Sequence, residues 1–195
     1  HFPGKTVFRA EKNGTAATLT LFITPDYDVC VWDLDICSND ADKEYDVFAY
    51  AELSQQRITD EFMNEYYWRH MHKTRFDDKT EAVIYINHRG DDVDISRIPM
   101  VYFASDRKIE SFSGDRDAFL GNYRSEQNPV AVERGFCGNE CIQSGEACCA
   151  LHVKVECKKG KNERTAFLFG AKKGALTNYE NAMNEIKCEL DALRR

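Results

Sequence analysis

Short runs of alternating apolar and polar residues, separated by turn residues, make up most of the chain. Such runs favour β-strands, because successive side chains of a strand point to opposite faces. Asn13 and Gly14, between two of these runs, form a strong hairpin-turn signal. The predicted strands are residues 6–10, 15–23, 29–37, 45–53, 66–76, 82–87, 99–104, 108–112, 149–157 and 164–169. Their number and spacing predict a mainly β fold, namely a large antiparallel β-sandwich.

The last part of the chain changes to helical spacing. Thr177 and Glu180 have the spacing of a capping box, and an amphipathic helix is predicted to run to the C-terminus. Its apolar positions are Tyr179, Met183, Ile186, Leu190 and Leu193. We expect this face to pack either back on the sandwich or against a partner.

Residues 115–135, DRDAFLGNYRSEQNPVAVERG, predict two helical turns joined by a polar elbow, residues 122–128. The residues that suit the helix ends are Ser113 or Asp115 and Gly121 for the first turn, and Asn128 (N-cap), Pro129 and Gly135 for the second. Polar and aromatic residues in a loop held at both ends indicate a positioned functional loop. The alternative is a surface connection that only packs over a sheet edge.

Composition narrows the class of protein. The chain has 195 residues, of which 43% are hydrophobic and 30% charged, as expected for one soluble globular domain. A net charge of −7 argues against nonspecific nucleic-acid or anionic-membrane binding, so we expect neither partner. The basic residues around Lys158 to Arg164 are interpreted as a hairpin tip. No apolar run is long enough to span a bilayer, and no secretion signal is present.

Eight cysteines, residues 30, 37, 137, 141, 148, 149, 157 and 188, raise the question of disulfides or a metal. A domain of this size does not need disulfides, so a reduced, cytoplasmic setting is predicted. Cys30 shares a predicted strand face with Trp32 and is expected to be buried. The four cysteines between 137 and 149 are separated by three, six and zero residues, unlike the paired spacing of zinc ligands. His70 and His72 share a strand face without an evident third ligand, so no metal site is predicted.

Two further groups have candidate chemistry. Asp33 and Asp35 lie on one strand face, where paired carboxylates could act as acid and base, or could simply face solvent. Tyr67, Trp68 and Arg69 offer aromatic faces for sugar rings and a planar donor for hydroxyls or phosphate. The alternative for this stretch is an aromatic strand that fills the core, with the arginine in solvent. No nucleophile elbow, Walker loop or dinucleotide motif occurs.

The central run also carries a resemblance. FLGNYRS, NPVAVERG and CGN, at residues 119–125, 128–135 and 137–139, resemble the signature of the N-terminal domain of the inverting β-glycoside phosphorylases, glycoside hydrolase family 94. This family includes cellobiose, cellodextrin, chitobiose and laminaribiose phosphorylases. Residues 12–25, 31–37, 45–52 and 147–155 also resemble family strands, in the same order, so that the resemblance covers nearly the whole chain.

The resemblance implies a supersandwich of the galactose mutarotase-like type. Residues 1–174 would be the sandwich, without its earliest strands, and residues 175–195 a linker helix leading to a helical barrel that this chain lacks. The implied reaction converts a β-linked di- or oligosaccharide and phosphate into an α-sugar 1-phosphate and a shortened sugar. Inorganic phosphate is then a co-substrate, and no cofactor is expected.

The resemblance also implies where the catalytic group lies. An aspartic general acid would come from the barrel, so no catalytic residue is assigned in this chain, and the isolated segment is predicted to be inactive. The domain would support the barrel, form a homodimer and line the substrate cleft. Candidates for that cleft wall are Tyr67, Trp68, Arg69, Arg124 and Asn128.

Two other functions remain open from the sequence. The chain could be a free-standing carbohydrate-binding module, which would need an exposed aromatic platform. It could also be a structural interaction domain whose terminal helix binds a partner through an exposed apolar face. Because the chain begins with His1 rather than Met, we expect it to be a fragment of a longer enzyme.

Overall fold

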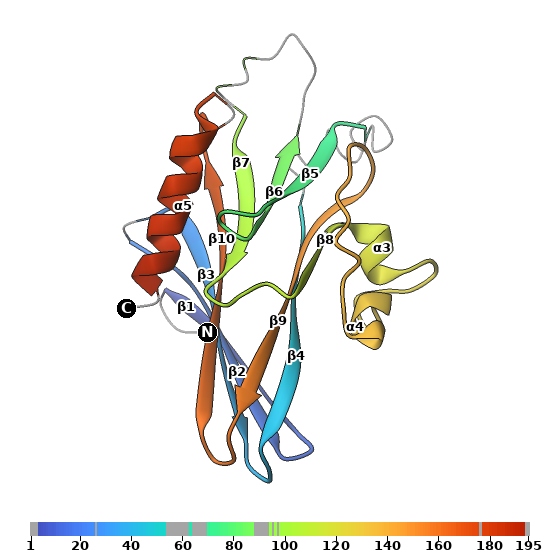
Figure 1. Ribbon diagram of the computed structural model, residues 1–195, viewed down its shortest axis with the longest axis vertical. Helices are drawn as coiled ribbons and strands as arrows, with labels where there is room; N and C mark the ends of the chain where they lie inside the picture. The colour runs from blue at the N-terminus through green and yellow to red at the C-terminus, as the bar shows by residue number, and fades with distance from the viewer. Residues whose placement is uncertain are drawn as a thin grey trace.

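A computed structural model describes residues 4–25, 27–53, 63, 70–87, 94, 96, 98–175 and 177–193 (Figure 1). The strands are β1 (Lys5–Lys12), β2 (Thr15–Ile23), β3 (Val29–Ser38), β4 (Lys43–Glu52), β5 (His72–Asp77), β6 (Ala82–Asn87), β7 (Met100–Ser105), β8 (Ser111–Asp115), β9 (Ala147–Cys157) and β10 (Asn162–Lys172). The helices are α3 (Arg116–Leu120), α4 (Val130–Arg134) and α5 (Tyr179–Leu193). The predicted mainly antiparallel β fold is therefore confirmed.

The strands form two antiparallel sheets of unequal size. The seven-stranded sheet A has the order β1-β2-β3-β10-β7-β6-β5, and the three-stranded sheet B has the order β4-β9-β8. The predicted Asn13–Gly14 hairpin is confirmed, with φ angles of 51° and 71° at its two central residues and Lys12 opposite Thr15. Positive φ at both positions is what a type I′ turn requires.

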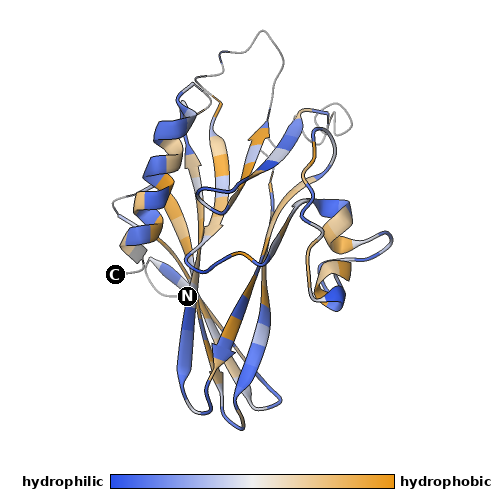
Figure 2. Ribbon diagram, viewed as in Figure 1, coloured by the Kyte–Doolittle hydropathy of each residue, from blue (hydrophilic) through white to orange (hydrophobic). Residues whose placement is uncertain are grey.

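The main core lies between the two sheets. Leu151, Val153 and Val155 of β9 pack against Phe103 of β7 and Phe167 of β10, and all five are buried. Strands β6, β7 and β10 are covered on their other face as well, so they are apolar on both sides rather than alternating. Figure 2 shows this as largely apolar colouring along β6 and β7, in contrast to the alternating bands of α5.

Helix α5 packs on the outer face of sheet A. Met183, Ile186 and Leu190 are at most 4% exposed and join a second apolar cluster with Tyr102 and Leu168 of the sheet. The helix therefore packs back on the sandwich, and the part of its apolar face that the structure describes is not available to a partner. That removes the observation that would have favoured an interaction domain acting through this helix.

Polar contacts hold α5 at both ends. Near its N-terminus the Tyr179 hydroxyl donates to Asp77 at 2.8 Å, and the Arg75 guanidinium lies 3.6 Å from the centroid of the Tyr179 ring. Burial, with the hydrogen bond to Asp77, raises the pKa of Tyr179 to about 12. Further along, the buried Glu189 carboxylate accepts from the Tyr102 hydroxyl and pairs with Lys172. These contacts fix the direction in which the helix crosses the sheet.

Several predicted boundaries are wrong by a few residues. Strand β8 begins at Ser111 rather than 108, and β10 continues to Lys172, three residues past its predicted end. Helix α5 begins at Tyr179, and the Thr177 hydroxyl donates to the Gly174 carbonyl, so Thr177 does not form the predicted capping box. The predicted strand at 66–76 is described only from residue 70, with β5 starting at His72.

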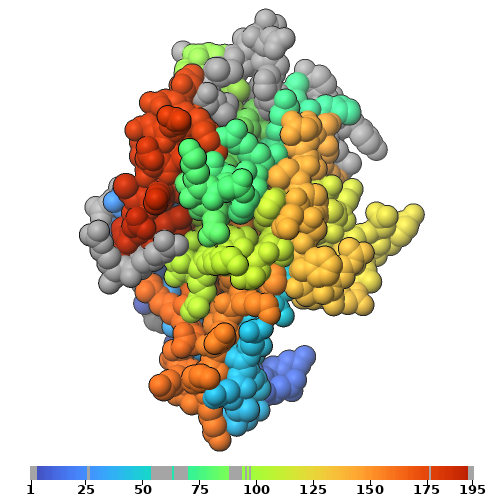
Figure 3. All heavy atoms as spheres, viewed as in Figure 1, coloured from blue at the N-terminus to red at the C-terminus, as the bar shows by residue number. Residues whose placement is uncertain are grey.

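Helices α3 and α4 cover the outer face of sheet B. Phe119, Leu120 and Ala131 are buried against Cys148 and Ala150 of β9. Figure 3 shows this segment, in yellow and gold, projecting from the side of the molecule opposite α5. The molecule therefore has four layers, with α5, sheet A, sheet B and the α3–α4 segment in that order.

Candidate functional site

Most of the helix-end residues predicted for α3 and α4 are confirmed, and one is wrong. The Asp115 carboxylate accepts from the Asp117 and Ala118 amides at 2.9 and 3.2 Å, which confirms it as the cap of α3. Gly135 ends α4 with a left-handed φ of 81°. The predicted N-cap Asn128 is wrong, because Pro129 holds that position and makes no side-chain cap bond.

Gly121 is required where the elbow, residues 122–128, leaves α3. Its φ is 89°, and a Cβ at this position would lie 3.0 Å from the Cβ of Val130. A side chain here would therefore be strained and would push α4 away from α3. The glycine lets the chain double back, so the elbow projects into solvent between two anchored helices.

A surface hollow of about 420 Å³ lies beside this elbow. We call it the elbow hollow; it is lined by Asp117, Ala118, Gly121, Asn122, Arg124, Val130, Ala131, Arg134, Phe136, Gly138 and Glu140. Two guanidinium groups and an amide can donate to hydroxyls or phosphate, and two carboxylates can accept from hydroxyls. The hollow is thus chemically suited to a polar ligand such as a sugar.

Of the two predicted cleft residues that the structure describes, it brings Arg124 to this hollow and leaves Asn128 outside it. Arg124 lines it and pairs with Glu133 of α4. Asn128 is exposed, donates its amide to the Ser125 carbonyl at 2.9 Å, and lines neither this hollow nor the one on the other side of the elbow. Tyr67, Trp68 and Arg69 lie outside the described residues.

Two further residues at the hollow were not predicted from the sequence as cleft residues. Arg134 and Phe136 line it, and Phe136 is 54% exposed. Tyr123 of the elbow does not line the hollow, but it is fully exposed and has a left-handed φ of 60°, which is uncommon for an aromatic residue. An exposed ring in a strained backbone is a feature of positioned loops. The only sequence signal was the presence of these residues in or next to a polar elbow.

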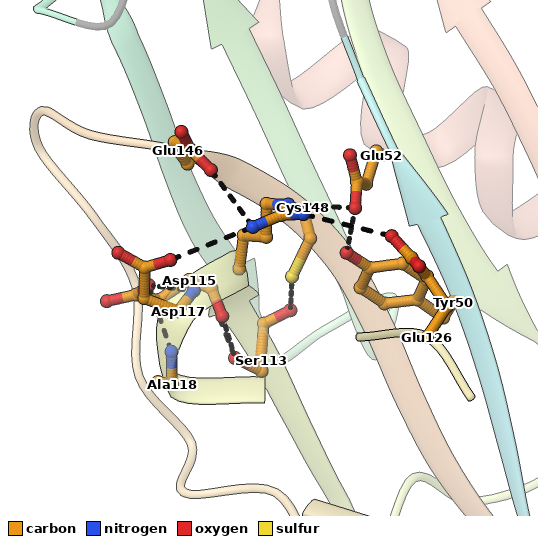
Figure 4. Close-up of polar contacts among 10 residues, drawn as sticks. Tyr50, Glu52, Ser113, Asp115, Asp117, Ala118, Glu126, Glu146 and Cys148 are labelled. Atoms are coloured by element: carbon orange, nitrogen blue, oxygen red, sulfur yellow. Dashed lines mark hydrogen bonds and ion pairs between the residues drawn. The ribbon is translucent and has the colours of Figure 1, made fainter. Parts of the chain in front are cut away.

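Arg116, the first residue of α3, links the α3–α4 segment to sheet B through ion pairs. Its guanidinium lies 2.8 Å from Glu52 of β4, 3.2 Å from Glu146 and 3.8 Å from both Asp117 and Glu126 of the elbow. Figure 4 labels the four acidic residues, with dashed lines marking their ion pairs, and shows the Tyr50 hydroxyl directed at Glu52. One cation therefore ties together four parts of the chain, including the elbow.

The Arg116 cluster predicts a dependence of stability on pH. Burial raises the pKa of the Glu52 carboxyl, but hydrogen bonds from Tyr50 and Arg116 outweigh burial and hold it below its ordinary value of 4.5. A carboxyl with a lowered pKa in the folded state contributes stability above its unfolded pKa and loses it as the pH falls through the folded value. We expect Glu52→Gln to flatten the fall in the free energy of unfolding between about pH 5 and about pH 3, measured by urea denaturation. Parallel pH curves for the two proteins would contradict this assignment.

A Ser–His–Asp chain on the same side of sheet B has a structural role. The Ser111 hydroxyl lies 3.0 Å from Nδ1 of His152, and Nε2 of that ring lies 2.8 Å from Asp46. The hydroxyl also accepts from the Cys137 amide at 2.8 Å, and both Ser111 and His152 are buried. A nucleophile has to reach its substrate, so this chain of bonds holds the loop at Cys137 on the sheet.

The other residues with candidate chemistry already have partners within the fold or lie in different surroundings. Asp33 forms an ion pair with Arg164 at 2.5 Å, so its carboxylate is held by a cation. His70 is exposed and bonds to Ser144 at 3.1 Å, whereas His72 is buried, so the two rings do not share an environment. Cys30 is half-buried rather than buried. In the described part of the chain, no three histidine, cysteine or acidic side chains gather as metal ligands.

All eight cysteines are free thiols, and burial raises the pKa of several of them. For Cys137 the pKa rises to about 12. A thiol with such a pKa is not a reactive nucleophile at neutral pH. Among the described helices, none has the length and apolarity needed to cross a bilayer.

Comparisons with known proteins identify the family. Two curated relatives are N,N'-diacetylchitobiose phosphorylases, from Vibrio furnissii (33% identical over 169 residues) and Vibrio proteolyticus (31% over 170 residues). Each match covers 86% of this chain and 20% of the relative, so the chain spans about a fifth of the length of these proteins.

A solved structure described as a putative kojibiose phosphorylase from human microbiome shares the fold. Its TM-score is 0.51 at 8% identity, covering 95% of this chain and 20% of that one. The family described as "Glycosyl hydrolase 94, supersandwich domain" matches residues 1–187. The chain therefore belongs to the supersandwich-domain family of glycoside hydrolase family 94.

Proposed function

We propose that this chain is the supersandwich region of an inverting β-glycoside phosphorylase. The proposed enzyme converts a β-linked di- or oligosaccharide and phosphate into an α-sugar 1-phosphate and a shortened sugar. The observation that carries the proposal is the family match over residues 1–187, together with two relatives that are chitobiose phosphorylases. N,N'-diacetylchitobiose is therefore the first substrate to test.

In this proposal the domain supplies no catalytic group. A general acid in a helical barrel outside this chain protonates the glycosidic oxygen while phosphate attacks the opposite face of the sugar, replacing the activated water of an inverting hydrolase. The enzyme is cytoplasmic and homodimeric, and needs no cofactor. The supersandwich supports the barrel and walls the substrate cleft.

The elbow hollow is the proposed part of that wall. Arg124 and Arg134 place two planar donors beside Asn122 and the exposed Phe136, a combination that suits sugar hydroxyls and ring faces. Arg116 holds the elbow through its ion pair with Glu126. Tyr67, Trp68 and Arg69 remain candidates for the same wall, as does Asn128 outside the hollow.

The test compares this chain with the same chain extended through the proposed barrel. Each is incubated with N,N'-diacetylchitobiose, cellobiose, cello-oligosaccharides or laminaribiose plus phosphate, and α-sugar 1-phosphate is quantified. We expect product only from the extended protein. Product from the 195-residue chain alone would contradict the non-catalytic role, and no product from either would contradict the phosphorylase assignment.

A carbohydrate-binding module is the second candidate, because Tyr123 and Phe136 are exposed beside the elbow hollow. It predicts that the isolated chain binds a β-linked oligosaccharide in a calorimetric titration. Tyr123→Ala should then weaken that binding, whereas an exposed tyrosine elsewhere, Tyr27, can be replaced as the control. Binding without phosphorolysis by the extended protein would favour this function.

A further inference from the structure

One carboxylate of the elbow hollow is held in a fixed position. It belongs to Glu140, whose Oε1 lies 2.9 Å from the fully buried Ser113 hydroxyl. Its Oε2 lies against Gly138, where an added Cβ would overlap that oxygen. No side chain or amide among the described residues donates to Oε2, so this oxygen remains available as an acceptor.

The backbone around Glu140 is tied to β8. The Gly114 amide donates to the Glu140 carbonyl at 2.8 Å, and residues 113 and 140 form a parallel bridge. One residue earlier, the Asn139 amide donates to the Phe112 carbonyl, and the Asn139 side-chain oxygen accepts from the Phe112 amide, both at 2.9 Å. Because the backbone and the carboxylate are both held, a ligand would lose less entropy in ordering Glu140 than in ordering a mobile surface glutamate.

The charged side chains that line the elbow hollow balance one another. They are Asp117, Arg124, Arg134 and Glu140. Arg124 pairs with Glu133, and Asp117 lies 3.8 Å from Arg116, so these two already have partners of opposite charge. In the part of the chain that the structure describes, neither Arg134 nor Glu140 has an ion-pair partner. One donor group and one acceptor group therefore remain for a ligand.

This combination favours a neutral polyol over an anion. A sugar hydroxyl both donates and accepts, so a sugar can donate to the Glu140 carboxylate and accept from the Arg134 guanidinium. Phosphate is mostly an acceptor at neutral pH, so it could bond to the guanidinium but not to the carboxylate. Glu140 and Asp117 would also repel it as like charges.

Holding the loop does not by itself account for the Glu140 side chain. The loop is already fastened to β8 by the backbone bonds of Asn139 and Glu140 and by the bond from the Cys137 amide to Ser111. Only one carboxylate oxygen is used in the contact with Ser113. The other oxygen is left to the hollow, and Gly138 provides the space in which it lies.

We propose that Glu140 is the specificity-determining residue of the elbow hollow, and that it selects a neutral sugar and excludes phosphate. Ser113 and Gly138 are its positioning residues, the first through a hydrogen bond and the second through the absence of a side chain. This inference rests on the proposed function, in which the hollow walls a cleft that receives both an oligosaccharide and phosphate. It assigns the hollow to the sugar alone.

Calorimetric titration of the 195-residue chain with N,N'-diacetylchitobiose and with inorganic phosphate tests the selectivity. We expect the unsubstituted chain to bind the disaccharide, and Glu140→Gln to bind it about tenfold more weakly, because a neutral amide replaces a charged acceptor. Glu140→Gln should also bind phosphate about tenfold more tightly than the unsubstituted chain does, because a like charge has been removed. A residue that only holds the loop would not produce this gain.

Gly138→Ala separates the position of the carboxylate from its charge. The added methyl group meets the end of the Glu140 side chain, so the carboxylate can move aside while the backbone stays in place. We expect disaccharide binding to weaken about tenfold, as in Glu140→Gln, without any gain in phosphate binding. Glu180→Gln, at an exposed position of α5 on the opposite side of the molecule, is the control and should change neither affinity. Melting temperatures within about 2 °C of one another would show that all variants are folded.

Kinetics of the full-length phosphorylase that contains this chain give an independent readout. We expect Glu140→Gln to raise the KM for N,N'-diacetylchitobiose about tenfold, while kcat and the KM for phosphate change less than about twofold. That pattern is the loss of a contact made equally in the ground state and the transition state. Equal increases in both KM values would overturn the selectivity.

The outcomes separate the role of Glu140 from the proposed function. Unchanged disaccharide binding and an unchanged KM in Glu140→Gln, in a protein that makes α-sugar 1-phosphate, would overturn the role and leave the function intact. Weaker disaccharide binding by Glu140→Gln, when the full-length protein makes no α-sugar 1-phosphate, would support the role and overturn the function. Phosphate binding by the unsubstituted chain as tight as its disaccharide binding would overturn the selectivity. A chain that binds neither ligand, with an unchanged KM in the full-length variant, would overturn it as well.

Discussion

Replacing Gly170 with alanine is expected to lower the free energy of unfolding by about 3 kcal/mol, the upper range for overpacking a filled core. Gly170 lies opposite Tyr102 in the register of β10 and β7, and the tyrosine ring covers the glycine. An added Cβ would lie 2.5 Å from two ring atoms of Tyr102, far inside van der Waals contact. The ring would have to move, and its hydroxyl would then leave the buried Glu189 carboxylate.

The effect of Gly170→Ala is measured by urea denaturation against two companion variants. Tyr102→Phe removes only the hydrogen bond to Glu189 and is expected to cost about 1 to 2 kcal/mol. Ala171→Ser changes the next residue of the strand, whose side chain is exposed, and is expected to cost less than about 0.5 kcal/mol. If Gly170→Ala were no more destabilising than Ala171→Ser, the close packing of Tyr102 on this glycine would be wrong.

Replacing Arg116 with methionine is expected to lower the free energy of unfolding by about 2 kcal/mol and to loosen the elbow. The substitution keeps the apolar stem but leaves Glu52, Glu146 and Glu126 without the cation that they share. The Arg116 side chain is 30% exposed, so solvent screens part of the lost attraction and keeps the expected loss of stability small. Arg116→Lys should recover part of the stability, because an ammonium keeps the charge without the planar fork of donors.

Arg124→Met is the matched control for Arg116. It removes an exposed pair with Glu133 and is expected to cost less than about 1 kcal/mol. Hydrogen exchange in the elbow should speed up in Arg116→Met and stay nearly unchanged in Arg124→Met. Faster exchange in Arg124→Met than in Arg116→Met would show that Arg124, and not Arg116, holds the elbow.

Local signals allowed much of the fold to be predicted from the sequence. Asn13 and Gly14 identify a turn because few other residue pairs adopt two positive φ angles, and the hairpin register follows from that turn. Asp115 could be recognised as a cap because a short carboxylate before a helical turn bonds to the free amides of that turn. These are interactions between residues close in the sequence, so spacing alone reveals them.

The candidate site could be predicted less well. Arg124 was found because the elbow is polar and lies between two helix-end signals, but Arg134 and Phe136 join it only after the chain turns back at Gly121. Asn128 carries the residue type of an N-cap, yet the helix begins one residue later. A cap assignment depends on the exact backbone path, which a residue type alone does not specify.

The sequence by itself determined the β-rich class, the hairpin turns, the two-turn segment at the elbow and the amphipathic character of the last helix. Only the tertiary structure decided that α5 packs on sheet A and that Arg116 joins β4, Glu146 and the elbow. The reason is physical. Turns, caps and periodicity depend on neighbours along the chain, whereas burial and shared ion pairs depend on residues that meet after strands far apart in sequence have paired.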